Sequence, residues 1–365
     1  MAKKLHVGYP NIGNKAVFLE RADQILNSFQ LTNDGKFVRE FESKLEEFLG
    51  VKNCITVNTG TMALELIIGA LELTGSVIVP SFTFIATVHA LKRLGIDPIF
   101  CDIDPITHHI NPDKIEGLIR DDTTAIIGVH LWGRPCNVDA ICNVGLRNNL
   151  HVFFDAAHAF GCSHKGKMVG NFGEAEAFSF HATKVLNAFE GGLITTNNDF
   201  LADKLKNMKR FGFCGYDNVT CLGTNGKMNE ISAAMGITNL ESLDIFIRKN
   251  YQNCREYENR LDKIHGVRML KWDENEKNNY QYIVIEVKRN RDHIINKLHS
   301  EGILARRYFY PGCHRMEPYR SMHKDDDLPI TNSVCGRVIV LPNGMQMEKG
   351  DIEKICGIIE MELKC

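Results

Sequence analysis

Two residues of opposite charge stand where apolar segments of this sequence end. Asp155 lies in the apolar segment Val152–Ala156, and Lys184 follows the segment Phe178–His181 among small and apolar neighbours. A carboxylate at the end of a buried strand is costly unless a cation or a hydrogen-bond donor meets it, and a protonated pyridine nitrogen would do so. A lysine among apolar groups is a candidate for a lowered pKa. It is therefore also a candidate for a Schiff base with a carbonyl compound.

A third segment has the composition of an anion site. Asn58-Thr59-Gly60-Thr61 directly precedes an apolar stretch that begins at Met62. Glycine lets the backbone approach a ligand closely, and the free N–H groups at a helix start favour a phosphate. Ser179, five residues before Lys184, offers a hydroxyl to the same anion.

Each of these features also has a plain structural interpretation. The Thr59-Gly60 pair can be a simple helix cap, and Asp155 can cap the next helix or pair with a basic side chain. His158 can be a buried histidine with structural partners, and Lys184 can be a surface lysine. The segment Gly223–Glu230 by itself is only a polar loop. The order of the charged and phosphate-binding features along the chain favours one shared site.

Alternating short apolar segments and helical segments must position these residues. The predicted strands lack polar alternation, as expected for strands that are buried on both faces. The order is α/β and predicts a mostly parallel sheet with helices on both sides, whose ligands bind beyond the carboxyl ends of the strands. The predicted strands are Val77–Pro80, Pro98–Asp102, Ala125–Trp132, Val152–Ala156, Phe178–His181 and Leu193–Thr196. The predicted helices between them are Met62–Leu73, Phe84–Leu94, Asn137–Asn148 and Asp199–Arg210.

The texture of the sequence changes after Asn239, and we expect a second, smaller domain there. The predicted division is a large domain at 1–240, which includes the N-terminal segment, and a small α+β domain at 241–365. The elements predicted in the small domain are a long helix at Leu240–Ile264, a strand at Tyr280–Val287, a helix at His293–Glu301, a strand at Ile303–Tyr310 and a final helix at Lys349–Leu363.

Composition excludes several classes of protein. The chain has 365 residues, 44% hydrophobic, with a formal net charge of −2, so nothing indicates a nucleic-acid or membrane partner. We find no signal-peptide core and no apolar stretch that could span a bilayer, which predicts a cytoplasmic protein. The 12 cysteines are scattered without a Cys-x-x-Cys pair, and no metal site is expected. The dinucleotide and P-loop fingerprints are absent.

Four motifs together resemble the DegT/DnrJ/StrS sugar aminotransferases, which are fold type I enzymes dependent on pyridoxal 5′-phosphate. The resemblance extends from about Gly35 to beyond Pro342. The motifs are Val79-Pro80-Ser81-Phe82-Thr83-Phe84, Val129-His130-Leu131-Trp132-Gly133, Asp155-Ala156-Ala157-His158 and Ser179-Phe180-His181-Ala182-Thr183-Lys184.

This resemblance implies a role for each matching residue. Lys184 would form the Schiff base with the cofactor, and Asp155 would keep its pyridine nitrogen protonated. The phosphate would be held by Gly60, Thr61 and Ser179, the ring would stack on Phe84, and His158 would lie near the ring hydroxyl. Asn225 would reach the phosphate from a second subunit, which implies a homodimer with shared active sites. Tyr308 and His314 are candidates for substrate contact.

The resemblance also implies a reaction. It is strongest to members that transfer an amino group from L-glutamate to C-4 of dTDP-4-keto-6-deoxy-D-glucose, with pyridoxamine 5′-phosphate as the intermediate cofactor form. Such enzymes serve deoxyamino sugar biosynthesis, including that of lipopolysaccharide O-antigen. Amination at C-3 and amination of a UDP-sugar at C-4 stay open on the same scaffold. The related sugar 3-dehydratases carry histidine in place of Lys184. A regulator that only senses the cofactor would usually carry an added DNA-binding domain.

Overall fold

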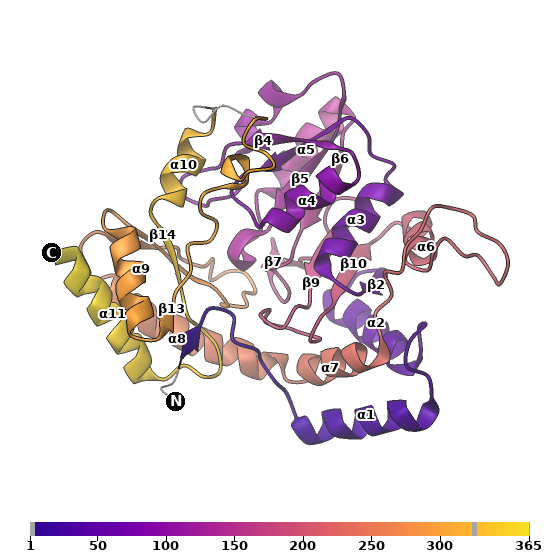
Figure 1. The fold of residues 1–365 in the computed structure, drawn as a ribbon, viewed down its shortest axis with the longest axis horizontal. Coiled ribbons are helices and arrows are strands. Elements are labelled where there is room, and N and C mark those ends of the chain that lie inside the picture. Colours follow the sequence, from indigo (N-terminus) through magenta and orange to yellow (C-terminus); the bar gives the residue numbers. More distant parts are fainter. Residues whose placement is uncertain (1–3, 323–326, 365) are drawn as a thin grey trace.

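A seven-stranded sheet forms the centre of the computed structural model, which describes residues 4–322 and 327–364 (Figure 1). The strand order is β2-β10-β9-β6-β5-β3-β4. Neighbouring strands from β9 to β4 are parallel, whereas β10 is antiparallel to both β2 and β9. The strands are β2 (Asn53–Val57), β3 (Ser76–Pro80), β4 (Asp97–Cys101), β5 (Thr123–Val129), β6 (His151–Asp155), β9 (Glu176–Ser179) and β10 (Gly192–Thr196).

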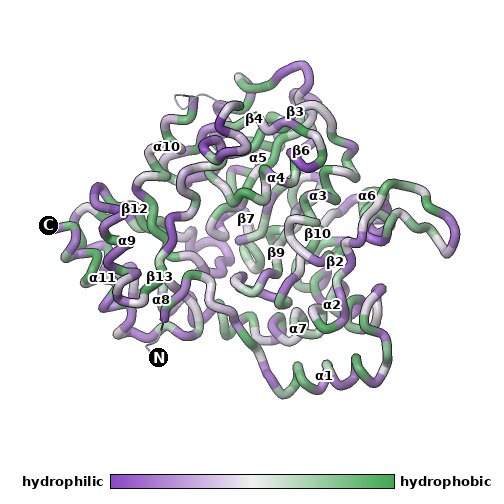
Figure 2. The backbone as a smooth tube through the Cα atoms, in the orientation of Figure 1, coloured by the Kyte–Doolittle hydropathy of each residue, from purple (hydrophilic) through white to green (hydrophobic). Residues whose placement is uncertain are grey.

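Helices cover both faces of this sheet, which explains why its strands are apolar at successive positions (Figure 2). Val77 and Val79 face one hydrophobic core, and Ile78 between them faces another. The first face packs against α3 (Gly60–Ala70), α4 (Ile85–Arg93) and α6 (Asp199–Met208). The opposite face packs against α2 (Lys36–Leu49), α5 (Val138–Asn148) and α7 (Glu230–Leu240). The helix α1 (Lys15–Ser28) lies outside, against α7.

The C-terminal third builds a second, smaller sheet with a hydrophobic core of its own. The strand β1 (Leu5–His6) near the N-terminus pairs with β13 in parallel, so the first residues join this part of the molecule. The division of the chain into domains at residue 240 stays a prediction. The elements here are α8 (Leu243–Leu261), β11 (Val267–Met269), β12 (Ile283–Val287), α9 (Arg291–Ser300), β13 (Ile303–Leu304), α10 (Pro329–Cys335), β14 (Val338–Leu341) and α11 (Lys349–Lys364).

Several predicted strands end earlier than expected. The predicted strand Ala125–Trp132 ends at Val129, because Leu131–Gly133 forms a 3₁₀ turn in which Trp132 has a positive φ, and β4 and β6 each end one residue early, at Cys101 and Asp155. The predicted strand Ile303–Tyr310 contains only the two residues of β13, because the chain then leaves β1 and Arg306 exchanges backbone hydrogen bonds with Val340 of β14 instead. The predicted strand Phe178–His181 already ends at Ser179. The remaining short elements are β7 (Ser163–His164), β8 (Lys167–Met168) and the 3₁₀ turns η1 (Pro112–Lys114), η2 (Glu116–Leu118), η3 (Leu131–Gly133) and η4 (Cys313–Arg315).

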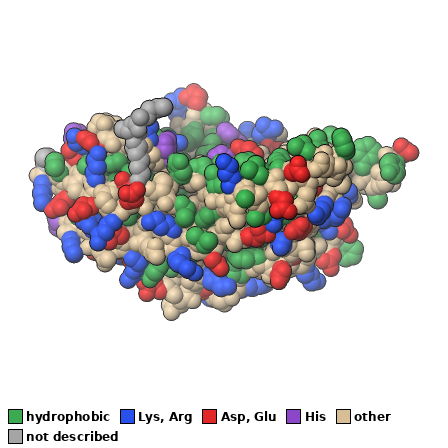
Figure 3. Space-filling model, turned by 90° about the horizontal axis from the view of Figure 1, so that it is seen from below, with side chains coloured by type: hydrophobic (Ala, Val, Ile, Leu, Met, Phe, Trp, Pro, Cys, Tyr) green, Lys and Arg blue, Asp and Glu red, His purple; other side chains and the backbone are tan. Residues whose placement is uncertain are grey.

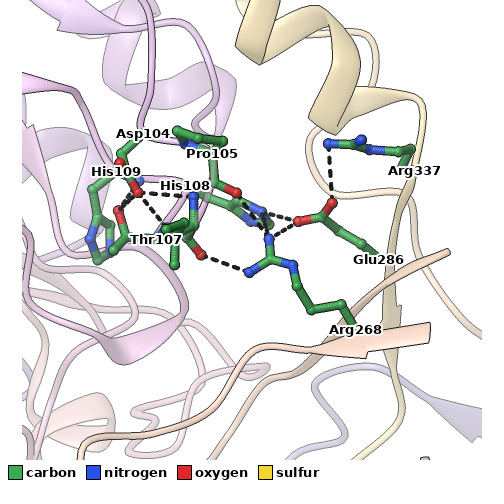
Figure 4. Close-up of polar contacts among 9 residues, drawn as sticks. Asp104, Pro105, Thr107, His108, His109, Arg268, Glu286 and Arg337 are labelled. Carbon is green, nitrogen blue, oxygen red and sulfur yellow. Dashed lines mark hydrogen bonds and ion pairs between the residues drawn. The ribbon is translucent and has the colours of Figure 1, made fainter. Parts of the chain in front are cut away.

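A buried carboxylate on β12 links the small sheet to the loop that follows β4 (Figure 4). Glu286 accepts from His108 Nε2 at 2.7 Å and forms ion pairs with Arg268 and Arg337. Arg268 also donates to the carbonyl of Pro105 at 2.9 Å. Since a buried charge is tolerated only when it is paired, this cluster fixes the small sheet relative to the large one. Among the residues described, no helix is both long and apolar enough to cross a membrane.

Candidate active site

A cavity of about 410 Å³ lies at the carboxyl ends of the parallel strands, where an open α/β sheet binds its ligands. Most of the residues predicted for the site border this one cavity. They are Gly60, Thr61, Phe84, Asp155, His158, Ser179, Lys184 and Tyr308. Further polar lining is provided by Thr59, Thr83, His130, His181, Thr183, Glu190, Tyr282 and Arg306.

The carboxylate of Asp155 lies at the end of β6 and is almost completely buried. Thr87 Oγ1, on α4, donates to Asp155 Oδ2 at 2.7 Å, and the backbone N–H of Ala157 donates to Oδ1 at 3.0 Å. These two donors orient the carboxylate while leaving lone pairs for a cation in the cavity. Thr87 was not among the predicted residues, although it lies three residues after Phe84 on the same helix.

Lys184 follows β9 in a turn, and its backbone N–H donates to the carbonyl of His181 at 2.9 Å. Burial lowers the pKa of Lys184 from 10.5 to about 8, and the charge of Asp155 acts in the opposite direction. A large fraction of the Lys184 side chains is therefore in the neutral amine form near pH 8. A neutral amine is what Schiff-base formation requires.

The start of α3 forms the polar end of the cavity. Thr59 caps this helix through its hydroxyl, which accepts from the N–H of Met62 at 3.1 Å. The first-turn amides of Gly60 and Thr61 are N–H groups that a helix leaves without intrahelical partners. A Cβ at position 60 would lie 2.9 Å from the Cβ of Ser179, so glycine is what lets this helix start meet β9.

Aromatic rings form another part of the cavity lining, namely those of His158, Tyr282 and Phe309. His158 packs against Tyr282, with ring centroids 4.4 Å apart, and stacks on Trp132 and Phe309. Burial, and also the charge of Lys184, lower the pKa of His158 well below its usual range. The backbone N–H of Trp132 donates to His158 Nδ1 at 3.2 Å, so the neutral ring carries its proton on Nε2. Nothing in the sequence around Tyr282 marked it as part of this lining.

Two predicted residues do not border the cavity. His314 is buried, with Nδ1 2.6 Å from Ser81 Oγ and Nε2 3.0 Å from the side-chain oxygen of Asn332, so its observed contacts are structural. Asn225 lies in the loop before α7, where its side-chain oxygen accepts from Lys227 at 2.6 Å. The role of Asn225 in the site of a second subunit stays a prediction.

The family model of the DegT/DnrJ/EryC1/StrS aminotransferases matches residues 14–360. The chain belongs to this family. A transaminase for dTDP-4-amino-4,6-dideoxy-D-glucose from Shigella dysenteriae is 36% identical, and the match covers 98% of this chain and 99% of that protein. A GDP-perosamine synthase from Caulobacter vibrioides is 32% identical over 93% of this chain and 94% of its own length.

Solved structures of this family have the same fold. The crystal structure of DesI in the presence of its TDP-sugar product has a TM-score of 0.95 and 39% identity, and the match covers 100% of this chain and 94% of that chain. The structure of Streptomyces venezuelae DesV in complex with a ketimine intermediate has a TM-score of 0.91 at 25% identity, over 96% of this chain and 95% of that chain. The protein is therefore a sugar aminotransferase with the fold type I architecture.

Enzymes of the DegT/DnrJ/EryC1/StrS family depend on pyridoxal 5′-phosphate, with pyridoxamine 5′-phosphate as the intermediate form, and so does this protein. The residues at the cavity fit that cofactor. Such a site needs a lysine, a carboxylate for the pyridine nitrogen and donors for a phosphate. Lys184, Asp155 and the cradle of Gly60, Thr61 and Ser179 supply these three groups within one cavity.

Proposed function

We propose that this sugar aminotransferase transfers the amino group of L-glutamate to C-4 of dTDP-4-keto-6-deoxy-D-glucose, giving dTDP-4-amino-4,6-dideoxy-D-glucose. The reaction class rests on one observation: Lys184, whose pKa is lowered, and Asp155 border the same cavity. The sugar is supported by the 36% identity to the Shigella dysenteriae transaminase and the 39% identity to DesI.

The cofactor would be held at three places by residues of this chain. Gly60, Thr61 and Ser179 would bind its phosphate, Asp155 would accept from the ring nitrogen, and Phe84 and His158 would contact the ring. When bound, the cofactor supplies an electron sink for the carbon that gains or loses a proton. Asp155 stabilises the positive charge on the ring, because Thr87 and Ala157 hold its carboxylate in place.

Lys184 would carry the proton during transfer. Its Nζ would take the proton from the α-carbon of the donor in the first half of the reaction and would give a proton to C-4 of the sugar in the second, acting in turn as general base and general acid, while the amino group and a proton would stay on the bound cofactor between the two halves. A base works best when its pKa lies near the working pH, and burial brings the pKa of Lys184 to about 8. His158 stays neutral beside it, so no second positive charge opposes protonation of Lys184.

The substrates of the reaction are anions, and Arg306 is a cationic group placed to meet them. It borders the cavity, and its guanidinium lies 5.5 Å from the ring of Tyr308. We propose that Arg306 and Tyr308 contact a carboxylate of glutamate or a phosphate of the sugar nucleotide. His314 stays a weaker candidate, since its side chain lies outside the cavity lining.

We further propose a homodimer in which Asn225 of one subunit reaches the phosphate in the other. An arm at residues 209–225 projects beyond α6 (Figure 1), and apolar side chains gather at that end of the molecule in Figure 3. Tyr216 and Leu222 on this arm are 98% and 91% exposed. Large apolar side chains so exposed typically mark a protein interface. A cytoplasmic location and a role in O-antigen synthesis stay predictions.

A GDP-linked sugar is the second candidate substrate, because the GDP-perosamine synthase of Caulobacter vibrioides is also 32% identical over nearly the whole chain. The distinguishing experiment is turnover of the purified enzyme with glutamate and either dTDP-4-keto-6-deoxy-D-glucose or a GDP-linked 4-keto sugar. Product NMR then gives the carbon and the orientation of the amine. An equatorial amine at C-4 of the dTDP-sugar is expected, and amination at C-3 or preference for the GDP-sugar would contradict the proposal. Lys184→Ala is expected to abolish turnover.

A further inference from the structure

The peptide groups on both sides of Lys184 are held by one side-chain amide. Gln281 Oε1 accepts from the backbone N–H of Val185 at 3.1 Å, while Gln281 Nε2 donates to the carbonyl of Thr183. Gln281 lies 96 residues from Val185, in the segment before β12. A primary amide offers a donor and an acceptor side by side, so it pairs with backbone as a neighbouring strand would.

This pairing satisfies backbone N–H and C=O groups that have no partner within a helix or strand. Residues 181–185 lie outside any helix or strand, and buried peptide groups there need partners from elsewhere. The carbonyl of Val185 accepts from Asn11 Nδ2 at 3.0 Å, and the N–H of Lys184 donates to His181. Gln281 supplies the partners that remain for Thr183 and Val185, so the main chain that carries Lys184 has little freedom.

The same segment also holds the histidine of the site. Asn279, which is completely buried, donates through Nδ2 to the carbonyls of His158 at 2.8 Å and Phe160 at 3.0 Å. Its side-chain oxygen accepts from the N–H of Gln281 at 3.1 Å, which orders the two amides relative to each other. The next residue, Tyr282, packs on the ring of His158 and borders the cavity. One short segment therefore contacts both Lys184 and His158.

We infer that Gln281 is a positioning residue. It keeps Lys184 at the distance and orientation that proton transfer between the reacting carbons requires. This inference rests on the proposed role of Lys184. A proton carrier must lie within hydrogen-bond reach of two carbons in turn, and small misplacement of a reacting group is costly. Gln281 lies just before β12, a strand of the small sheet. Its hydrogen bonds therefore connect the C-terminal part of the chain to the backbone beside Lys184.

The test is Gln281→Glu, which keeps size and shape but replaces the donor to Thr183 with a second acceptor. Gln281→Met removes both hydrogen bonds at similar volume, and Gln252→Glu on the exposed surface of α8 is the control for the added charge. We expect kcat to fall about 10- to 100-fold in both Gln281 variants, with a much smaller change in the KM for glutamate. The deuterium isotope effect with α-deuterated glutamate should rise, since proton transfer becomes slower.

A second readout needs no turnover. The pH dependence of the absorbance of the bound cofactor reports on its link to Lys184, and we expect it to shift in the Gln281 variants but not in Gln252→Glu. The inference would be overturned if Gln281→Glu had the same kinetics, isotope effect and absorbance titration as the wild-type enzyme. A loss of activity explained entirely by lower cofactor content would also overturn it. Failure of the wild-type enzyme to aminate the dTDP-sugar would contradict the proposed function alone, because the reaction with glutamate and the absorbance titration do not involve the sugar.

Discussion

At the scale of single residues, the site combines a lysine whose pKa is lowered by burial with a carboxylate that two hydrogen-bond donors hold in place. Lys184 has its pKa lowered to about 8 because burial disfavours the charged amine more than Asp155 favours it. Asp155 is buried as well, and two hydrogen-bond donors orient its carboxylate. The amine of Lys184 therefore loses its proton more readily than an exposed lysine does.

The lowered pKa of Lys184 predicts how the stability of the cofactor-free protein depends on pH. Between about pH 8 and 10.5 the unfolded chain binds a proton that the folded chain has lost, so the free energy of unfolding should rise with pH in that window. Below pH 8 the folded protein carries a partly buried ammonium at a cost on the order of 3 kcal/mol. Lys184→Met should therefore be more stable than wild type at pH 7.5 and lose this advantage by pH 10.5. Urea unfolding at both pH values measures the effect, with the exposed Lys349→Met as control.

Thr87 gives a second prediction at this scale. Thr87→Val removes the 2.7 Å hydrogen bond to Asp155 at almost constant volume, whereas Thr87→Ser keeps the hydroxyl. A hydrogen bond to a charged group contributes about 1.5 to 3 kcal/mol, so cofactor affinity should fall about 10- to 100-fold in Thr87→Val. Titration of the cofactor-free protein with pyridoxal 5′-phosphate measures this. Equal affinity of the valine and serine variants would contradict the assigned contact.

At the scale of elements, the start of α3 and the end of β9 approach each other closely at the proposed phosphate site. Gly60 is required because a Cβ there would meet the Cβ and Cα of Ser179 at 2.9 and 3.1 Å. Those atoms belong to a central strand and cannot move away without disturbing the sheet. Gly69 on the same helix faces only Met208 Cε, the tip of a flexible side chain, at 3.0 Å.

The contrast between these two glycines is testable. Gly60→Ala should lower stability by about 1 to 3 kcal/mol through overcrowding and should weaken cofactor binding further, because the first-turn amides shift away from Ser179. Gly69→Ala should be neutral, or slightly stabilising, since alanine is favoured over glycine inside helices. Urea unfolding and cofactor titration on both variants give the comparison. Similar behaviour of the two would show that the approach of α3 to β9 is not critical.

At the scale of the whole molecule, a homodimer would complete the site through Asn225, which lies away from the cavity of its own chain. The exposed apolar arm at 209–225 is the surface that such a dimer would cover. In a symmetric dimer each subunit gives its arm and receives the other. The proposal therefore predicts complementation between subunits.

Mixing Lys184→Ala with Asn225→Ala chains, after unfolding and refolding them together, should restore activity at limiting cofactor. One site of each mixed dimer then combines an intact Lys184 with an intact Asn225. The control is a mixture of Lys184→Ala with Asp155→Asn, where both changes affect the same chain's site and no mixed dimer contains a complete one. Restoration in the control, or none in the test mixture, would contradict shared sites.

Much of this arrangement could be predicted from local sequence. The strands and helices around Asp155 and Lys184 follow from apolar segments and their lengths, since parallel strands buried on both faces must be apolar throughout. Asp155, Ser179 and Lys184 could be predicted to lie together because polar groups that follow buried strands meet at one edge of a sheet, and all three border one cavity. The family resemblance added Phe84 and a predicted role for His158, and both residues border the same cavity.

Only the tertiary structure decided the rest. The antiparallel course of β10, the early end of the strand predicted at Ile303–Tyr310 and the amide pairing of Gln281 all depend on segments far apart in the chain. Local periodicity reports which face of a segment is buried, but it does not report which distant backbone group needs a partner. The sequence by itself indicated the chemistry expected at Lys184 and Asp155, because residue type and position after a buried strand are local properties. Gln281 and Thr87, which contact the backbone beside Lys184 and the carboxylate of Asp155, are brought there only by folding.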